Sequence, residues 1–192
     1  GKLMISTFIV SDWFAWSPRG DWIAYLEENK LNIVNPVTLE KRTLVEADRI
    51  SAPIYWLPNG VDLNFYNPEK LFINWRKEKG FSENDFILLY AGIIGHAQGL
   101  EVILKTANRL RSNDNIKFIF LGNGPEKDKL LFVKNKLMLF NVFFCDSVPK
   151  NEMPAILYHI DASIIPLKKI DLFKGAIPSK IFECLAMKKT IL

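Results

Sequence analysis

The stretch FILLYAGIIGHAQG, residues Phe86–Gly99, decides the fold of this chain. Its first six residues form a continuous apolar run, which is typical of a strand buried on both faces of a sheet. Gly92 then breaks the run, and Gly95 and Gly99 follow before a segment with helical spacing. We therefore predict a buried strand, a glycine-rich turn and the start of a helix, in that order.

A turn of this kind suits an anion such as a phosphate. Glycine lets the backbone come close to a ligand, and the free N–H groups and positive dipole end of the next helix favour negative charge. Glycine turns also occur where a strand and a helix simply pack closely. From this stretch by itself, both a phosphate site and a packing turn stay open.

The sequence after this stretch alternates regularly between apolar runs and amphipathic segments. The further runs are IKFIFLG, NVFFCD and ASIIPL, and the segment LEVILKTANRL places its Leu, Ile and Ala residues on one helical face. Repeated strand–helix–strand units predict a parallel sheet with right-handed crossovers, a Rossmann-like doubly wound domain. We expect it to be incomplete, because the chain stops at Thr190–Leu192, inside what should be a strand.

Residues 1–53 have a different pattern. Phe14 and Trp16 alternate, as do Trp22, Ala24 and Leu26, and turn residues separate them, which predicts a small antiparallel β-meander. Residues 12–46 resemble one blade of a TolB-like β-propeller. A single blade leaves sheet edges uncovered, so we expect this segment to pack on something else or to come from a larger array. The alternative is a small structural sheet without chemistry. The predicted domains are therefore 1–53 and 54–192.

Composition excludes several classes of protein. The chain is 49% hydrophobic and 24% charged, which is ordinary for a globular protein. Its net charge of +4 is spread along the chain without a basic block, so we expect no nucleic-acid partner. No apolar run approaches the roughly 18 residues that a membrane-spanning helix needs. We expect a cytoplasmic location, or the inner face of a membrane, with Cys145 and Cys184 as free thiols.

Candidate binding residues follow the predicted strands, because ligands of doubly wound sheets bind at the carboxyl ends of the strands. The last such loop contains Pro178 and Ser179, which can start a helix that meets a phosphate, with Lys180 and Glu183 on its first turns. Glu183 is an acceptor for ribose hydroxyls if it faces the crevice. If it does not, it is a solvated helix residue.

Five phrases, in this order, resemble the donor-binding half of family 4 glycosyltransferases of the GT-B fold. They are PNGVDLNFYNP, YAGIIGHAQGLEVILKTANRL, IFLGNGPEKDKL, SVPKNEMPAILYHIDASIIPL and IPSKIFECLAMKKTIL. These segments are most similar to the branch that resembles transferases of N-acetyl-fucosamine to lipid-linked O-antigen or capsule units.

This resemblance implies retaining transfer of a sugar from a nucleotide diphosphate donor, usually UDP-linked, to a glycan or lipid-linked acceptor in polysaccharide biosynthesis. It implies no cofactor and no metal. The implied donor-binding residues are Gly92, Gly95, Gln98 and Gly99 at the diphosphate, Gly122 and Gly124 in the nucleotide pocket, Ser179 and Lys180 at the phosphate end, and Glu183 at the ribose. Catalytic residues stay unassigned. The acceptor domain is expected to be missing, so the chain alone should be inactive, with any peripheral membrane association made through the missing regions.

The sequence also departs from the family pattern. Many members have Arg after the first glycine and Lys before the last, where this chain has Ile93 and Gln98. The paired glutamates of the wider family are incomplete, since Gly175 stands in the place of the first. The candidates for a compensating cation are Lys180, Lys168, Lys169 and Lys174. The loss of both basic residues favours a rival hypothesis, a non-enzymatic interaction or scaffold protein, whereas the intact glycine spacing and the segment PSKIFE favour the transferase.

Overall fold

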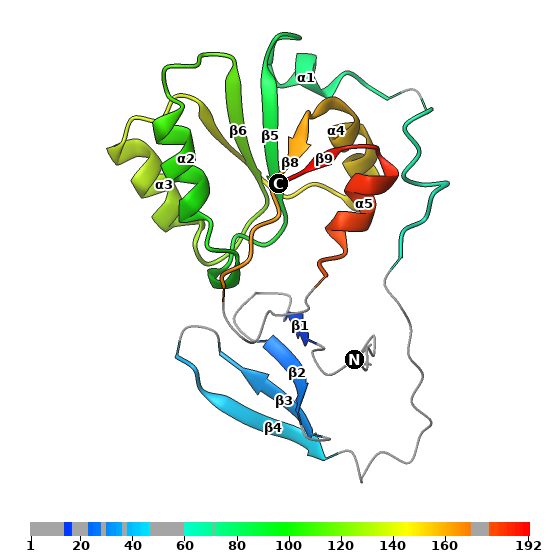
Figure 1. Ribbon diagram of the computed structural model, residues 1–192, viewed down its shortest axis with the longest axis vertical. Helices are drawn as coiled ribbons and strands as arrows, with labels where there is room; N and C mark the ends of the chain where they lie inside the picture. The colour runs from blue at the N-terminus through cyan, green and yellow to red at the C-terminus, as the bar shows by residue number, and fades with distance from the viewer. Residues whose placement is uncertain are drawn as a thin grey trace. The chain divides into compact units, whose positions relative to one another are not determined.

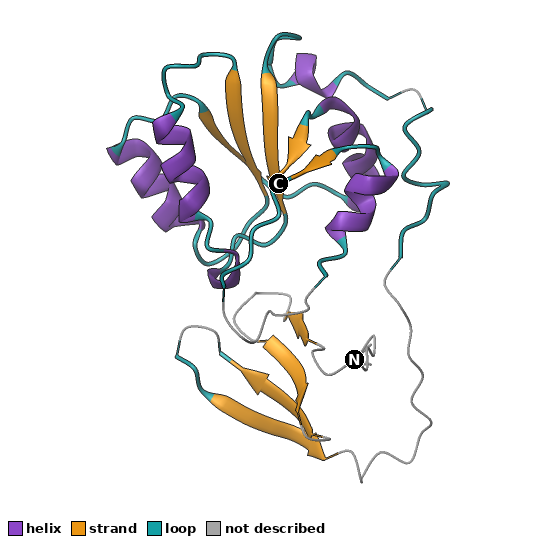
Figure 2. Ribbon diagram, in the orientation of Figure 1, coloured by secondary structure: helices purple, strands orange, loops and turns teal. Residues whose placement is uncertain are grey.

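The computed structural model describes residues 14–16, 23–27, 30–35, 38–46, 60–70, 72–169 and 177–192. The chain divides into two compact units, one comprising residues 1–59 and 167–177, the other residues 60–166 and 178–192. Figure 1 follows the chain through both units, and Figure 2 marks their helices and strands.

The first unit contains a four-stranded antiparallel sheet. Its strands are β1 (Phe14–Trp16), β2 (Ile23–Glu27), β3 (Lys30–Val34) and β4 (Lys41–Glu46), paired in chain order (Figure 1). The buried Asn32 of β3 accepts a hydrogen bond at Oδ1 from Thr43 Oγ1 on β4, at 2.7 Å. The predicted β-meander is therefore confirmed, while its resemblance to a propeller blade stays a prediction.

The second unit is built on a five-stranded parallel sheet. Its strands are β5 (Phe86–Ala91), β6 (Ile116–Leu121), β7 (Val142–Cys145), β8 (Ala162–Ser163) and β9 (Thr190–Ile191). They lie in the order β7-β6-β5-β8-β9. The strand order thus reverses between β5 and β8, which makes the carboxyl end of β5 the place where such sheets bind ligands. The predicted doubly wound α/β fold is confirmed.

Helices cover both faces of this sheet (Figure 2). They are α1 (Trp75–Glu78), α2 (Glu101–Arg109), α3 (Lys127–Lys136), α4 (Met153–His159) and α5 (Lys180–Ala186), with 3-10 turns η2 (His96–Gln98) and η3 (Lys150–Glu152). Leu88 and Tyr90 of β5 pack with α2 and α3, whereas Ile87 and Leu89 pack with α1, α4 and α5. The continuous apolar run is therefore explained by burial on both faces.

Two predicted elements are shorter than their patterns indicated. The helix expected from LFINWRKEKG is only the four residues of α1, and Asn74 caps it by accepting a hydrogen bond from Lys77 N at 3.0 Å. The strand expected from ASIIPL is only the two residues of β8. The amides of Ile164 and Ile165 still donate to the neighbouring backbone, so the extended pairing continues as far as Pro166, which has no N–H.

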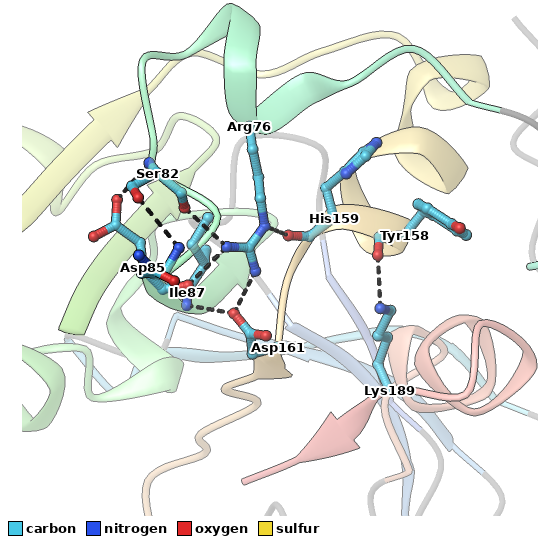
Figure 3. Close-up of polar contacts among 9 residues, drawn as sticks. Arg76, Ser82, Asp85, Ile87, Tyr158, His159, Asp161 and Lys189 are labelled. Atoms are coloured by element: carbon cyan, nitrogen blue, oxygen red, sulfur yellow. Dashed lines mark hydrogen bonds and ion pairs between the residues drawn. The ribbon is translucent and has the colours of Figure 1, made fainter. Parts of the chain in front are cut away.

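A buried arginine ties together the amino ends of β5 and β8 (Figure 3). Arg76 Nη2 contacts Asp161 Oδ2 at 2.6 Å, and its other nitrogens donate to the carbonyls of His159, Ser82 and Asp85. The same Asp161 oxygen accepts from Ile87 N at 2.7 Å. This network lies at the edge of the sheet opposite the predicted binding site, so it is part of the framework.

Candidate functional site

The first three loops at the carboxyl edge leave the sheet side by side. The ladder between strands continues into them, because Gly92 N donates to Leu121 O at 2.9 Å and Gly122 N donates to Cys145 O at 3.0 Å. One step further, Ile94 N donates to Asn123 O at 2.9 Å. The loops after β5, β6 and β7 are therefore one hydrogen-bonded layer.

Gly122 and Gly124 are glycines because the first loop leaves no room for a side chain. Both have positive φ, +143° and +156°. A β-carbon on Gly122 would lie 2.0 Å from Gly92 O, and one on Gly124 would lie 2.4 Å from Ile94 O. The packing interpretation therefore accounts for both glycines, and their contact with a nucleotide stays a prediction.

The turn after β5 leads directly into α2. Gly95 is extended, η2 follows, and Gly99 adopts the left-handed conformation with φ 60° before α2 begins at Glu101. A β-carbon on Gly95 would lie 3.0 Å from Gln98 Oε1. That Gln98 oxygen is buried and has no hydrogen-bond partner among the described residues. Tyr66, Asn141 and His159 each have such an atom as well, so the Gln98 oxygen does not by itself mark a ligand site.

Lys180 reaches from the start of α5 across the end of β5. Its Nζ donates to Ala91 O at 2.8 Å, and a β-carbon on Gly92 would lie only 2.7 Å from that nitrogen. Within the described part of the chain, no carboxylate lies within ion-pair distance of Lys180. Burial lowers the pKa of Lys180, and the more distant negative charge of Glu183 opposes that shift. A cation without a direct counter-ion therefore lies at the glycine turn.

Glu183 and Ser179 lie on either side of Lys180 along α5. Ser179 occupies the N-cap position but its side chain caps nothing, and it is exposed. Glu183 is partly buried and lies near Tyr66, a buried residue of the phrase PNGVDLNFYNP. Burial and the Glu183 carboxylate together raise the pKa of Tyr66. Glu183 therefore lies near a buried hydroxyl, and its contact with a ribose stays a prediction.

A polar network braces the turn from the side of α3. His96 Nδ1 lies 2.9 Å from Glu126 Oε1, and Lys129 Nζ contacts both Glu126 and Glu101, at 2.9 and 2.7 Å. Because Glu101 begins α2, this network connects η2, α2 and α3. Sequence reasoning missed it, since ion pairs between separate helices leave no periodic signal.

The structure therefore brings most of the predicted site residues together. Gly92, Gly95, Gln98 and Gly99 form the turn, Gly122 and Gly124 pack beneath it, and Lys180 reaches it. Lys174 and Gly175 lie outside the described residues, and Lys168 and Lys169 belong to the other compact unit. Tyr90 was not predicted, although a tyrosine just before a glycine turn that ends a buried strand is a visible signal.

A family model for glycosyl transferases group 1 matches residues 72–192, which is more than half of the chain. The chain belongs to this family. Its matched residues include the glycine turn, the loops beside it and the whole of α5. The resemblance drawn from the five phrases is thereby confirmed.

Among curated proteins, the putative colanic acid biosynthesis glycosyl transferase WcaI of Escherichia coli K12 is 31% identical over 112 residues. The match covers 58% of this chain and 27% of that protein. This chain therefore corresponds to about a quarter of its relative's length.

Solved structures show the same fold. A glycosyltransferase from Rickettsia africae superposes with a TM-score of 0.60 at 16% identity, covering 77% of this chain and 38% of the other. WaaG, a glycosyltransferase involved in lipopolysaccharide biosynthesis, gives 0.59 at 17% identity, with coverages of 71% and 36%. The C-terminal domain of LpcC from Francisella tularensis gives 0.57 at 18% identity and covers 69% of each chain. These likenesses establish the fold of half a GT-B protein.

No helix in the described ranges is both long enough and apolar enough to cross a membrane. Cys145 and Cys184 are both free thiols, as predicted.

Proposed function

We propose that this chain is the donor-binding portion of a retaining glycosyltransferase. The donor is a nucleotide diphosphate sugar, UDP-linked, and the acceptor is a glycan or a lipid-linked sugar in polysaccharide biosynthesis. The chain alone binds the nucleotide and transfers no sugar, because acceptor recognition depends on regions beyond it.

The position of Lys180 carries this proposal. Burying a charge costs free energy unless an opposite charge or hydrogen bonds compensate it. Lys180 is partly withdrawn from water at the carboxyl end of β5, with one backbone carbonyl as its hydrogen-bond acceptor. The strand order reverses at this point, so a ligand is expected here. A diphosphate would supply the negative charge that Lys180 lacks.

The start of α2 supports the same ligand. The helix follows directly from the glycine turn, and the positive end of its dipole favours an anion, while the amides of Val102 and Ile103 already donate to Gly99 O and Leu100 O. Together with Lys180, this helix end supplies the positive charge for a diphosphate that Ile93 and Gln98 do not supply.

The chemistry that follows is mainly electrostatic. As the bond from the sugar to the diphosphate breaks, negative charge grows on the leaving group. Groups that are already oriented toward that charge lower the barrier. In this proposal Lys180 and the α2 N-terminus do so, and no metal ion is required for neutralisation.

The choice of UDP is supported by one further relative. Anabaena HepE, whose structure is described as a complex with UDP and glucose, superposes with a TM-score of 0.55 at 16% identity. We extend the nucleotide, and not the sugar, to this chain.

Isothermal titration calorimetry with UDP, UMP and uridine tests the proposal. We expect the wild-type chain to bind UDP more tightly than uridine, and Lys180→Met to lose roughly tenfold or more of that preference, since one charged hydrogen bond is removed. Lys188 is an exposed lysine just beyond the C-terminal end of α5, so Lys188→Met is the matched control and should change nothing. Heat equal to that of buffer at millimolar UDP would overturn nucleotide binding and favour the scaffold role. Sugar transfer by the isolated chain would overturn its inactivity.

A further inference from the structure

Tyr90 is the residue before the last of β5 (Phe86–Ala91), which leads into the glycine turn. Its side chain is 1% exposed and lies on the sheet face covered by α2 and α3. Its hydroxyl donates to Ile93 O at 2.5 Å, across the start of the glycine turn. The Tyr90 hydroxyl therefore contacts the glycine turn, while the ring is part of the core.

Lys180 meets this ring from the other side of the sheet. It belongs to α5, which packs on the opposite face from Tyr90, and its side chain crosses the end of β5 to do so. Its Nζ lies 4.9 Å from the centroid of the Tyr90 ring while it donates to Ala91 O. Gly92 completes the arrangement, because a side chain there would displace the ammonium.

These two contacts have different consequences for the lysine. An ammonium has three donor positions, and the Ala91 carbonyl takes one of them. The ring face attracts the charge through its quadrupole and takes no donor at all. The lysine is thus held in place with donor capacity left for a ligand.

We infer that Tyr90 is a positioning residue, whose ring holds the Lys180 ammonium at the glycine turn so that it meets the donor diphosphate. The inference rests on the proposed function for its ligand, but the ring–lysine contact can be tested without one. It assigns separate roles to two parts of one side chain. The ring positions the cation, and the hydroxyl fixes the Ile93 carbonyl.

The first experiment needs no nucleotide. The chain is labelled with ¹³C at the lysine ε-carbon, the Lys180 signal is assigned by its absence in Lys180→Arg, and its pKa is measured by NMR titration. Because the ring favours the charged form, Tyr90→Leu should lower the Lys180 pKa by roughly half to one unit, and Tyr90→Phe should leave it unchanged. Phe118→Leu removes an equally buried ring on the same face and is the matched control. An unchanged Lys180 pKa in Tyr90→Leu would overturn the inference.

The second experiment measures the preference for UDP over uridine in the same variants. Tyr90→Leu should reduce that preference about three- to tenfold while uridine affinity stays within about twofold, because the lysine acts on the diphosphate only. In the Lys180→Met background, Tyr90→Leu should reduce it no further. Equal weakening of both ligands, or a further loss in that background, would show a merely structural role.

Two safeguards keep the tests decisive. Should Tyr90→Leu fail to melt cooperatively, Tyr90→Met replaces it, since it too lacks the ring and is flexible enough to fill the space. Should the wild-type chain bind no UDP, the proposed function fails, and the NMR titration still decides whether Tyr90 holds Lys180.

Discussion

Gly122 lies directly against the carbonyl of Gly92, so closely that a β-carbon on Gly122 would come within 2.0 Å of the Gly92 oxygen. The contact joins the loop after β6 to the glycine turn after β5. Neither partner can move away easily, because Gly92 N is bonded to Leu121 O and Gly122 N to Cys145 O. The close approach of two backbones is therefore built into the site.

Replacement of Gly122 by alanine should be severely destabilising. The residue has φ +143°, where a side chain is strained, and its β-carbon would clash with backbone that is held in place. We expect Gly122→Ala to lower the free energy of unfolding by about 3 kcal/mol or more, measured by urea denaturation.

Two other glycines allow the cost of a left-handed φ to be distinguished from the cost of a steric clash. Gly80 has φ +75°, whereas Gly60 lies outside the left-handed region, and a β-carbon on either would meet no described atom within 4 Å. We expect Gly80→Ala to cost about 1–2 kcal/mol and Gly60→Ala to be nearly neutral. A Gly122→Ala loss no larger than that of Gly80→Ala would contradict the role of the Gly92 contact.

The Arg76 network should be a second source of stability. Arg76 is 7% exposed, and its removal would leave Asp161 without its cation and the carbonyls of His159 and Asp85 without the arginine donor, while Ser82 O keeps the Asp85 amide. We expect Arg76→Met to lower the free energy of unfolding by about 3–5 kcal/mol. Lys77→Met, at the exposed neighbouring position of α1, is the control and should stay within about 0.5 kcal/mol. Equal losses in the two variants would show that the network is dispensable.

Stability should fall on mild acidification because of His159. Burial lowers the pKa of His159; the Arg76 and Lys189 charges add to this shift, while Glu83 and a backbone contact at Ile73 oppose it. The unfolded chain therefore takes up a proton near pH 6.5 that the folded chain resists until a lower pH, so stability declines as pH drops below about 6.5. Urea midpoints between pH 7.5 and 5 should decline less steeply for His159→Gln. Parallel curves for the two proteins would rule this out.

Donor affinity should decline at alkaline pH. Burial lowers the pKa of Lys180 from its usual 10.5, so its charge is lost before that of an exposed lysine. The preference for UDP over uridine should therefore be constant near neutral pH and decrease as pH rises toward 10. Above about pH 7.5 the terminal phosphate is already ionised, so the change reports on the protein. Calorimetry of Lys180→Met over the same range should show no such trend, and a trend that persisted there would assign it to another group.

The fold was largely predictable because its sheet is buried on both faces. Apolar runs such as FILLYA, together with glycines at their ends, specify parallel strands by their length and position. The length of α1 was not predictable, since its Trp75 is buried by tertiary packing and not by helical periodicity. The two-residue extent of β8 was missed for a related reason, because Pro166 limits a pairing that an apolar run alone does not reveal.

The site was only partly predictable. The glycines could be identified from their spacing in the sequence. Their φ angles and close contacts exist only in the folded chain, and at Gly122 these show that close packing accounts for the glycine. Sequence reasoning named Lys180 as a candidate cation among several, and three-dimensional proximity selects it. Tyr90 lies within the apolar run Phe86–Ala91 and is a core residue. Its second contact, with Lys180, depends on a side chain ninety residues away in sequence.

Backbone hydrogen bonds join the three loops after β5, β6 and β7 into one layer. A substitution in the loop after β7, made for instance to alter which base is accepted, is therefore expected to change the position of Gly122 and, through it, the position of Gly92. Donor specificity in this chain would therefore be re-engineered most safely by transplanting all three loops from one relative, instead of changing them one at a time.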